Sequence, residues 1–391
     1  MLRLALACVA GPIAIALASV RYAVTFPQST DFAGVAATHQ AQATGLGCIY
    51  SRSVQLAGLH LVPGAGAPPL PADLIWHFNE PPLMTLFAAP FAALRLATAV
   101  NLWEVVLWVA LAACGFLLWR SRSGLPPWLT AAVIAGLLLN EIANTEFGLA
   151  QNDALLLVPA LLALELLRRH EDVGAGVLLG LVALKPQLIF LAVIALLIHH
   201  RWRLVAACAA TVAAIGATSI LMVGPSCSLQ WLGSATQLEE FQIGIGLPGT
   251  LARWTGSATA AEIAFVIFAI ISVAVLICIR RRIDTHVFVA VAIALAVVIG
   301  LHTLAYDVLF LAPLGMAVAR SKPWAVIAAG WGFTVAQLIY PDGPAPILAT
   351  ELVPFVAVTL AVVFIVRSGT PSEENPGRIN AASHRQLVAA T

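Results

Sequence analysis

Five short polar motifs interrupt a chain that is otherwise strongly apolar. Their carboxylates, imidazoles, amides and ammonium group are side chains that move protons or bind sugar hydroxyls and phosphate. No two motifs are close in the sequence, so any shared chemistry depends on a fold that brings them together. The motifs are Ser29-Thr30-Asp31-Phe32, His77-Phe78-Asn79-Glu80-Pro81-Pro82, Ala150-Gln151-Asn152-Asp153, Lys185-Pro186-Gln187 and His302-Thr303-Leu304-Ala305-Tyr306-Asp307.

Asp31 is a candidate general base, because a carboxylate can take the proton of a hydroxyl group as its oxygen attacks. It lies just after the first apolar run. An ionisable group so close to the membrane is energetically costly and tends to mark a functional site. His302 is a second candidate for the same task, since histidine titrates near neutral pH. Alternatively, Asp31 caps a helix beside Ser29 and Thr30, and His302 is an interfacial residue at a helix end.

Lys185 is the candidate phosphate-binding residue. A lysine inside an apolar span or at its edge is energetically costly and tends to mark a site. A departing phosphate needs positive charge as its own negative charge develops. Pro186 follows directly and argues against one continuous span. Alternatively, Lys185 snorkels towards the lipid headgroups.

Other polar side chains could bind substrate through hydrogen bonds. Those at 151–153 either contact sugar hydroxyls or cap the helix expected to begin at 154. Tyr306 either contacts substrate or belongs to an aromatic belt at the membrane surface. Glu80 and His77 either reach the substrate or form an exposed polar face. The candidate substrate-binding residues are Lys185, Gln151, Asn152, Asp153, Tyr306, Asp307, Glu80 and His77.

The elements that position these residues must be membrane helices. The 391 residues are 61% hydrophobic and 10% charged, with a mean hydropathy of +0.94, whereas soluble domains carry roughly 25% charged residues. We therefore predict an all-α polytopic membrane protein. The net charge of +1 gives no basic surface for nucleic acid. No cluster of His, Asp and Glu has the spacing of metal ligands.

Apolar runs separated by polar breaks predict the membrane spans. We expect both termini to be cytoplasmic, which requires an even number of spans, so 83–98 is predicted to be a re-entrant or in-plane element. About 12 true spans then remain. The helices on either side of Lys185 are short, which is typical of helices that border a cavity. The apolar runs lie near 3–24, 83–98, 102–119, 127–141, 154–168, 174–185, 187–199, 203–222, 260–279, 284–301, 307–319, 323–340 and 347–366.

Basic residues divide unevenly between the two sides if the spans alternate. Arg120, Arg168, Arg201, Arg280 and Arg320, with their basic neighbours, fall on one side, which the positive-inside rule makes cytoplasmic. The five polar motifs fall on the other side. Their chemistry is therefore expected on the extracytoplasmic face of the cell membrane.

The predicted membrane domain covers 1–367 and includes two long external loops, at about 25–82 and 223–259. The polar tail, 368–391, is predicted to be disordered and cytoplasmic. Cys48 and Cys227 lie in the two loops. They could form a disulfide, which needs a geometry that sequence does not define.

The five motifs resemble glycosyltransferase family 87, in the GT-C superfamily of polytopic transferases. The resemblance covers about residues 25–320: an Asp-Phe after the first span, a long first loop ending in Pro-Pro, a Gln-Asn pair, a Lys-Pro and a His…Tyr-Asp. Where family members often have Gly-Gln, this chain has Ala150-Gln151, and Asn79-Glu80 replaces a plainer pair. The resemblance implies a GT-C-like helical bundle with a long first extracytoplasmic loop.

The resemblance also implies an activity. The donor would be a polyprenyl-phosphate sugar and the acceptor a glycolipid or glycan of the bacterial cell envelope, with inversion and without an essential metal or other cofactor. Asp31 corresponds to the first-loop carboxylate of the superfamily and becomes the expected base, with His302 next. Mannose is the expected sugar and arabinofuranose the alternative.

A secondary transporter or lipid-linked-sugar flippase is the alternative from another class. Such proteins usually place ionisable residues at the bilayer midplane and contain inverted repeats. The polar motifs of this chain gather on one side instead, and the sequence has no evident repeat. The break at Lys185 fits either class.

Overall fold

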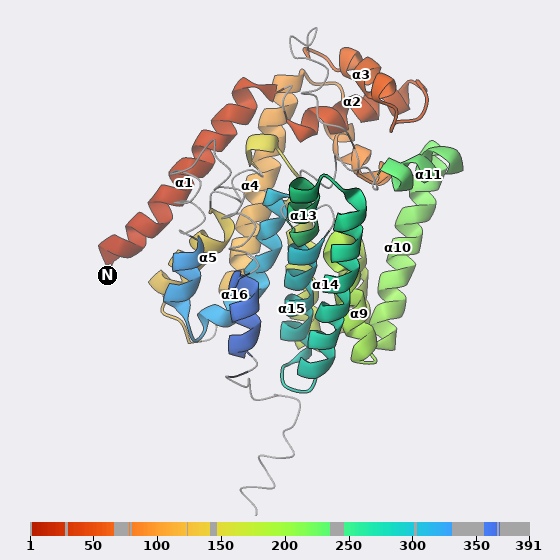
Figure 1. Ribbon diagram of the computed structural model, residues 1–391. Coiled ribbons are helices and arrows are strands. Elements are labelled where there is room, and N and C mark those ends of the chain that lie inside the picture. Colours follow the sequence, from red (N-terminus) through yellow and green to blue (C-terminus); the bar gives the residue numbers. More distant parts are fainter. Residues whose placement is uncertain are drawn as a thin grey trace, which may run out of the picture.

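A computed structural model of the chain describes residues 2–27, 30–65, 78, 80–122, 124–140, 147–234, 246–300, 303–330, 356–365 and 367. Every regular element within these ranges is helical (Figure 1). The predicted all-α class is therefore confirmed for the described part of the chain.

The helices before Lys185 include the long helix α4 and the short helix α8, which ends just before Lys185. They are α1 (Leu2–Thr25), α2 (Asp31–Ala43), α3 (Arg52–Leu61), the 3-10 helices η3 (Pro82–Phe87) and η4 (Ala89–Phe91), α4 (Leu96–Arg120), α5 (Pro127–Leu138), α7 (Asp153–Arg168) and α8 (Asp172–Val182).

The helices after Lys185 include one almost fully buried helix, α15. They are α9 (Pro186–Ile198), α10 (Trp202–Val223), α11 (Pro225–Ser234), α13 (Leu247–Thr255), α14 (Ala258–Ile279), α15 (Thr285–Ile299), η5 (Ala305–Leu311) and α16 (Ala312–Ala319). Because α15 contacts α7, α9, α14 and α16, its apolar side chains form the centre of the core.

Within the described residues, 3 helices are long and apolar enough to cross a membrane: α4, α10 and α14. Several shorter apolar helices, among them α5, α8, α9 and α15, pack around them. Length and composition thus support a membrane protein. The predicted number of about 12 spans remains a prediction.

The apolar run 83–98 does not form one helix. It consists of η3 and η4, and the long helix α4 then begins at Leu96. Pro90 lies inside this stretch and lacks a backbone N–H, so it interrupts helical hydrogen bonding. The predicted span 102–119 is consequently the later part of a longer helix.

The break at Lys185 is confirmed. The helix α8 ends at Val182, and α9 begins at Pro186 with Lys185 as its N-cap residue. The 11 residues of α8 and 13 of α9 are fewer than the roughly 20 that a spanning helix needs. Gly176 and Gly180 let α8 approach α10 closely, because a Cβ atom at either position would collide with α10.

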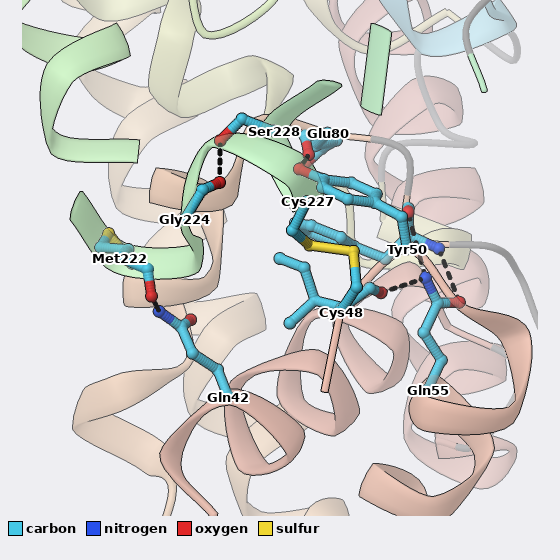
Figure 2. Close-up of a disulfide and its surroundings, with 11 residues drawn as sticks. Gln42, Cys48, Tyr50, Gln55, Glu80, Met222, Gly224, Cys227 and Ser228 are labelled. Carbon is cyan, nitrogen blue, oxygen red and sulfur yellow. Dashed lines mark hydrogen bonds between the residues drawn. A yellow bond between two sulfur atoms is a disulfide. The ribbon is translucent and has the colours of Figure 1, made fainter. Parts of the chain in front are cut away.

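The two predicted external loops meet at one end of the bundle, at the top of Figure 1, where α2, α3 and α11 lie together. A disulfide joins Cys48 to Cys227, with 5.3 Å between their Cα atoms (Figure 2). Gln42 of α2 also donates to the carbonyl oxygen of Met222 at 3.4 Å. The disulfide that these two cysteines could form is thus present, and the described parts of both loops lie at the same end.

Several basic turns meet at the other end. Arg201 contacts Asp172 at 3.4 Å and Thr285 at 3.4 Å, and Arg320 donates to the carbonyl oxygen of Ser121 at 3.2 Å. These contacts join the turns between helices that the sequence assigned to one side. The 16 residues of α7 separate the two ends by roughly 22 Å, at 1.5 Å per residue.

Candidate functional site

Lys185 lies in a buried cluster where three elements meet. Its Nζ atom is 2.6 Å from Oδ2 of Asp153, at the start of α7, and 3.5 Å from Oδ1 of Asp307, in η5. The ring centroid of Tyr306 is 4.4 Å from the same nitrogen. The backbone N–H of Leu304 donates to the other oxygen of Asp307 at 2.7 Å. The fold thus assembles three of the five sequence motifs around one ammonium group.

Two alternative interpretations of this cluster are wrong. Lys185 is only 4% exposed, so it does not snorkel towards the headgroups. Asp153 is the first residue within α7, and its carboxylate pairs with Lys185, so it does not act as the helix cap. A buried lysine is costly without partners, and these carboxylates compensate its charge.

Glu80 connects the end of the first loop to α7. Both of its carboxylate oxygens accept hydrogen bonds from Nδ2 of Asn152, at 3.0 Å each. The other amide atom, Oδ1 of Asn152, is buried and has no hydrogen-bond partner within the described ranges. The alternative interpretation of Glu80 as part of an exposed polar face is therefore wrong.

The backbone around Glu80 is held by two residues that the sequence did not single out. Tyr50 donates its hydroxyl to the carbonyl oxygen of Glu80 at 2.8 Å (Figure 2). The ring of Tyr50 also stacks on Phe78. Gln55 bonds both the N–H and the carbonyl oxygen of Phe78. Sequence offered no signal for these roles, because Gln55 reads as an ordinary polar residue of a helix.

Asp31 is the first residue of α2 but does not cap it. The cap is Thr30, whose hydroxyl oxygen accepts from the N–H of Ala33 at 3.3 Å. The Oδ1 atom of Asp31 is buried and lacks a hydrogen-bond partner among the residues that the structure describes. The capping interpretation of Asp31 is wrong, and its carboxylate has acceptor capacity left for a substrate.

Trp103 ties the Asp31 motif to the motif at 150–153. Its ring stacks on Phe32 with 5.1 Å between centroids, and its Nε1 donates to the carbonyl oxygen of Ala150 at 2.8 Å. Ala150 has a φ of 52°, in the left-handed region that glycine adopts more readily. This conformation explains why a glycine suits the position.

Burial and neighbouring charges make Asp31 a stronger base than an exposed aspartate. Removal from water raises its pKa well above the usual range, the carboxylates of Glu80 and Asp153 raise it further, and Lys185 opposes them. The pKa of Glu80 is also raised, mainly by burial, while Lys185 and the bond from Asn152 oppose this. Asp31 and Glu80 therefore lie close enough to Lys185 for its positive charge to act on both carboxyl groups.

The structure brings together most of the predicted site residues. Gln151 is buried beside Asn152, and Tyr306 is buried against Lys185. His77 and His302 lie outside the described residues, so their predicted roles stay predictions. The buried hydroxyl of Thr303, which sequence reasoning passed over, has no hydrogen-bond partner in the described segments.

The cluster contains several carboxyl groups and one ammonium group. Lys185 interacts electrostatically with Asp31, Glu80, Asp153 and Asp307. Within the described ranges, no group of three or more His, Cys, Asp or Glu side chains is arranged to hold a metal ion. Such a cluster can accept a proton at Asp31 and bind hydroxyl groups through amides and carboxylates.

The family model of glycosyltransferase family 87 matches residues 78–305. This range contains four of the five motifs in whole or in part, and it confirms the resemblance seen in the sequence. No curated protein matches the chain.

Proposed function

Because the chain belongs to glycosyltransferase family 87, we propose that it transfers a sugar from a polyprenyl-phosphate donor to a glycolipid or glycan of the cell envelope. Family membership and apolar helices make it a membrane glycosyltransferase. Mannose is the proposed sugar and arabinofuranose the alternative. Neither a transporter nor a flippase is favoured by the family match.

The observation that supports the mechanism is the buried Oδ1 atom of Asp31, which has no hydrogen-bond partner among the described residues. In the proposed reaction, Asp31 takes the proton of an acceptor hydroxyl as the oxygen attacks the anomeric carbon. The new carbon–oxygen bond forms as the bond to the phosphate oxygen breaks, and its electron pair leaves with the polyprenyl phosphate. Attack opposite the leaving group inverts the anomeric centre.

Lys185 is proposed to stabilise the departing phosphate. An ammonium group has three donors, and Asp153 and Asp307 use two of them. The remaining donor and the positive charge are available to a phosphate oxygen. The carboxylates hold the ammonium group in place, so that it is oriented before the donor binds.

The amide pair at 151–152 is proposed to bind sugar hydroxyls. The Oδ1 atom of Asn152, which has no partner within the described part of the chain, can accept a hydrogen bond from a hydroxyl, while its Nδ2 atom still donates to Glu80. Glu80, Tyr306 and Asp307 complete the proposed substrate-binding set, and His77 is retained in it. His302 is the proposed base if Asp31 only orients the acceptor.

We propose that this end of the bundle faces the extracytoplasmic side of the cell membrane, in a multi-pass topology with both termini cytoplasmic. The disulfide between the two loops supports this orientation, because disulfides persist in oxidising compartments. The basic turns at the opposite end support it independently.

Transfer from radiolabelled polyprenyl-phosphate mannose to endogenous lipid, in membranes containing the full chain, tests the proposal. Asp31→Asn preserves size and should lower the transfer rate by about 10²–10⁴-fold, the usual contribution of a general base. The matched control is Asp172→Asn, which removes a carboxylate at the opposite end and should retain transfer.

Other outcomes overturn separate parts of the proposal. Full transfer by Asp31→Asn would remove Asp31 from the base role and make His302 the next residue to replace. Transfer only from the arabinofuranose donor would exclude mannose. If wild-type membranes transfer neither sugar but move the lipid-linked donor between leaflets, the flippase alternative is correct.

A further inference from the structure

A cavity of about 260 Å³ lies at the far end of α7 from Asp153. It is enclosed by the ends of α4, α7, α15 and α16, and its inner wall is apolar. The apolar lining includes Leu161, Leu164, Ala290 and Met316. Its lining on α7 begins at Leu161, roughly 12 Å along the helix from Asp153 at 1.5 Å per residue, and it contains none of the residues of the Lys185 cluster, so it is a different site.

Arginine side chains from three helices converge on the cavity. Arg120 comes from the end of α4, Arg168 and Arg169 from the end of α7, and Arg320 from the residue after α16. Glu165 is the acidic residue among those lining the cavity. Four guanidinium groups and one carboxylate leave a local excess of positive charge.

Glu165 is shared between two of these arginines. Its Oε2 atom is 3.2 Å from Arg168, and its Oε1 atom is 2.8 Å from Arg169. One carboxylate compensates one positive charge, so the pair keeps a net charge. His286 also lines the cavity, and its buried Nε2 atom has no hydrogen-bond partner within the described ranges. The cavity therefore combines positive charge and an open hydrogen-bonding group with apolar walls.

We propose that this cavity binds the phosphate and the upper acyl chain of an anionic phospholipid from the cytoplasmic leaflet. Basic pockets between membrane helices on the cytoplasmic side suit such headgroups. A small, fully hydrated anion would not pack against the apolar wall, whereas an acyl chain would. The volume is below the roughly 300–1,000 Å³ of pockets that enclose a drug-sized ligand, so the rest of the lipid lies outside.

The surface of α4 gives the rest of the lipid an apolar path. Val109 and Phe116 are 65% and 59% exposed, and the Phe116 ring centroid is 5.9 Å from the guanidinium carbon of Arg120. An acyl chain that leaves the cavity near Arg120 would meet this surface.

The first experiment compares two lipids with the same acyl chains on the delipidated wild-type protein, by native mass spectrometry. Phosphatidylglycerol should bind in preference to phosphatidylcholine, because its headgroup has a net negative charge. Inorganic phosphate at millimolar concentration should not displace it. Equal binding of the two lipids would overturn the proposal, and displacement by inorganic phosphate would make the cavity a site for a free anion.

The second experiment assigns the binding to the cavity. Arg168→Gln combined with Arg320→Gln should weaken phosphatidylglycerol binding by about thirty-fold, since each basic residue near a membrane surface contributes a factor of about five. The matched control, Arg203→Gln with Arg281→Gln, removes two exposed arginines on the same side and should bind like wild type. Equal weakening in both double variants would show general charge attraction and overturn the assignment. The comparison of lipids on the wild type stands even if a variant fails to fold.

Discussion

Asn152 donates from its Nδ2 atom to both carboxylate oxygens of Glu80, at 3.0 Å each, although 72 residues separate the two in the sequence. This interaction fixes the end of the first long loop to the start of α7. The carboxylates of Glu80 and Asp153 both act electrostatically on Asp31, the proposed base. Asp153 also pairs with Lys185, the proposed leaving-group cation. The bond between Asn152 and Glu80 therefore helps to keep the base and the cation in a fixed relative position.

Replacing Asn152 with Leu should therefore destabilise the protein and lower transfer. The carboxylate of Glu80 would lose its donor while it stays removed from water, at a cost of about 1–3 kcal/mol. Thermal unfolding in detergent measures the loss. The second variant, Asn152→Leu with Glu80→Leu, removes both groups and should recover part of the stability without recovering transfer. An unchanged unfolding temperature in Asn152→Leu would mean that the bond contributes nothing.

The pH dependence of transfer should reflect the environment of Asp31. The carboxylate must be deprotonated to act as base, and burial and nearby carboxylates raise its pKa. The value of kcat/KM should accordingly rise with pH along an acid limb that lies well above the usual range of an aspartate. Glu80→Gln removes one nearby negative charge but keeps an acceptor for Asn152, so it should lower the pKa of Asp31 and move the limb to lower pH. A limb that stays in place, or moves to higher pH, would contradict the electrostatic argument.

Lys185→Met should be strongly destabilising, because it leaves the buried carboxylates of Asp153 and Asp307 without their cation. Breaking a buried pair in this way costs about 3–5 kcal/mol. The triple variant, with Asp153→Leu and Asp307→Leu added, removes the uncompensated charges. It should regain stability while remaining unable to transfer sugar.

An exposed ion pair provides the control for Lys185. Arg169→Met breaks the pair with Glu165, in which the Arg169 side chain is 50% exposed, and should change stability by less than about 1 kcal/mol. If Lys185→Met and Arg169→Met have equal effects on thermal unfolding, the buried cluster does not contribute as argued. If the triple variant recovers transfer, Lys185 has no part in the reaction.

Cysteine labelling tests the proposed orientation. In a background with Cys8→Ser and Cys278→Ser, whole cells treated with a membrane-impermeant maleimide should label the protein only after reduction of the Cys48–Cys227 disulfide. Cys114 and Cys208 are buried and should not react. Labelling that requires broken cells would place these loops on the cytoplasmic side and reverse the topology. Cys227→Ser should label without reduction, at Cys48, which is partly exposed, and this confirms the identity of the reactive thiol.

Sequence alone determined the class of the protein and its local breaks. Hydropathy acts along the chain, so a 61% hydrophobic composition was enough to predict helices in a membrane. Pro186 was enough to predict the interruption at Lys185, since proline lacks the N–H that a continuous helix requires. The motif types likewise sufficed to indicate the family.

Only the tertiary structure decided which polar groups meet and which keep a free atom. Thr30 rather than Asp31 caps α2, and this leaves the Asp31 carboxylate available. Asp307 reaches Lys185 across 122 residues, a separation over which no sequence pattern defines distance. Hydropathy is a property of neighbouring residues, so the sequence shows it directly. An ion pair or a buried carboxylate depends instead on how separate helices pack. Only that packing brings motifs that are distant in the sequence into one candidate site.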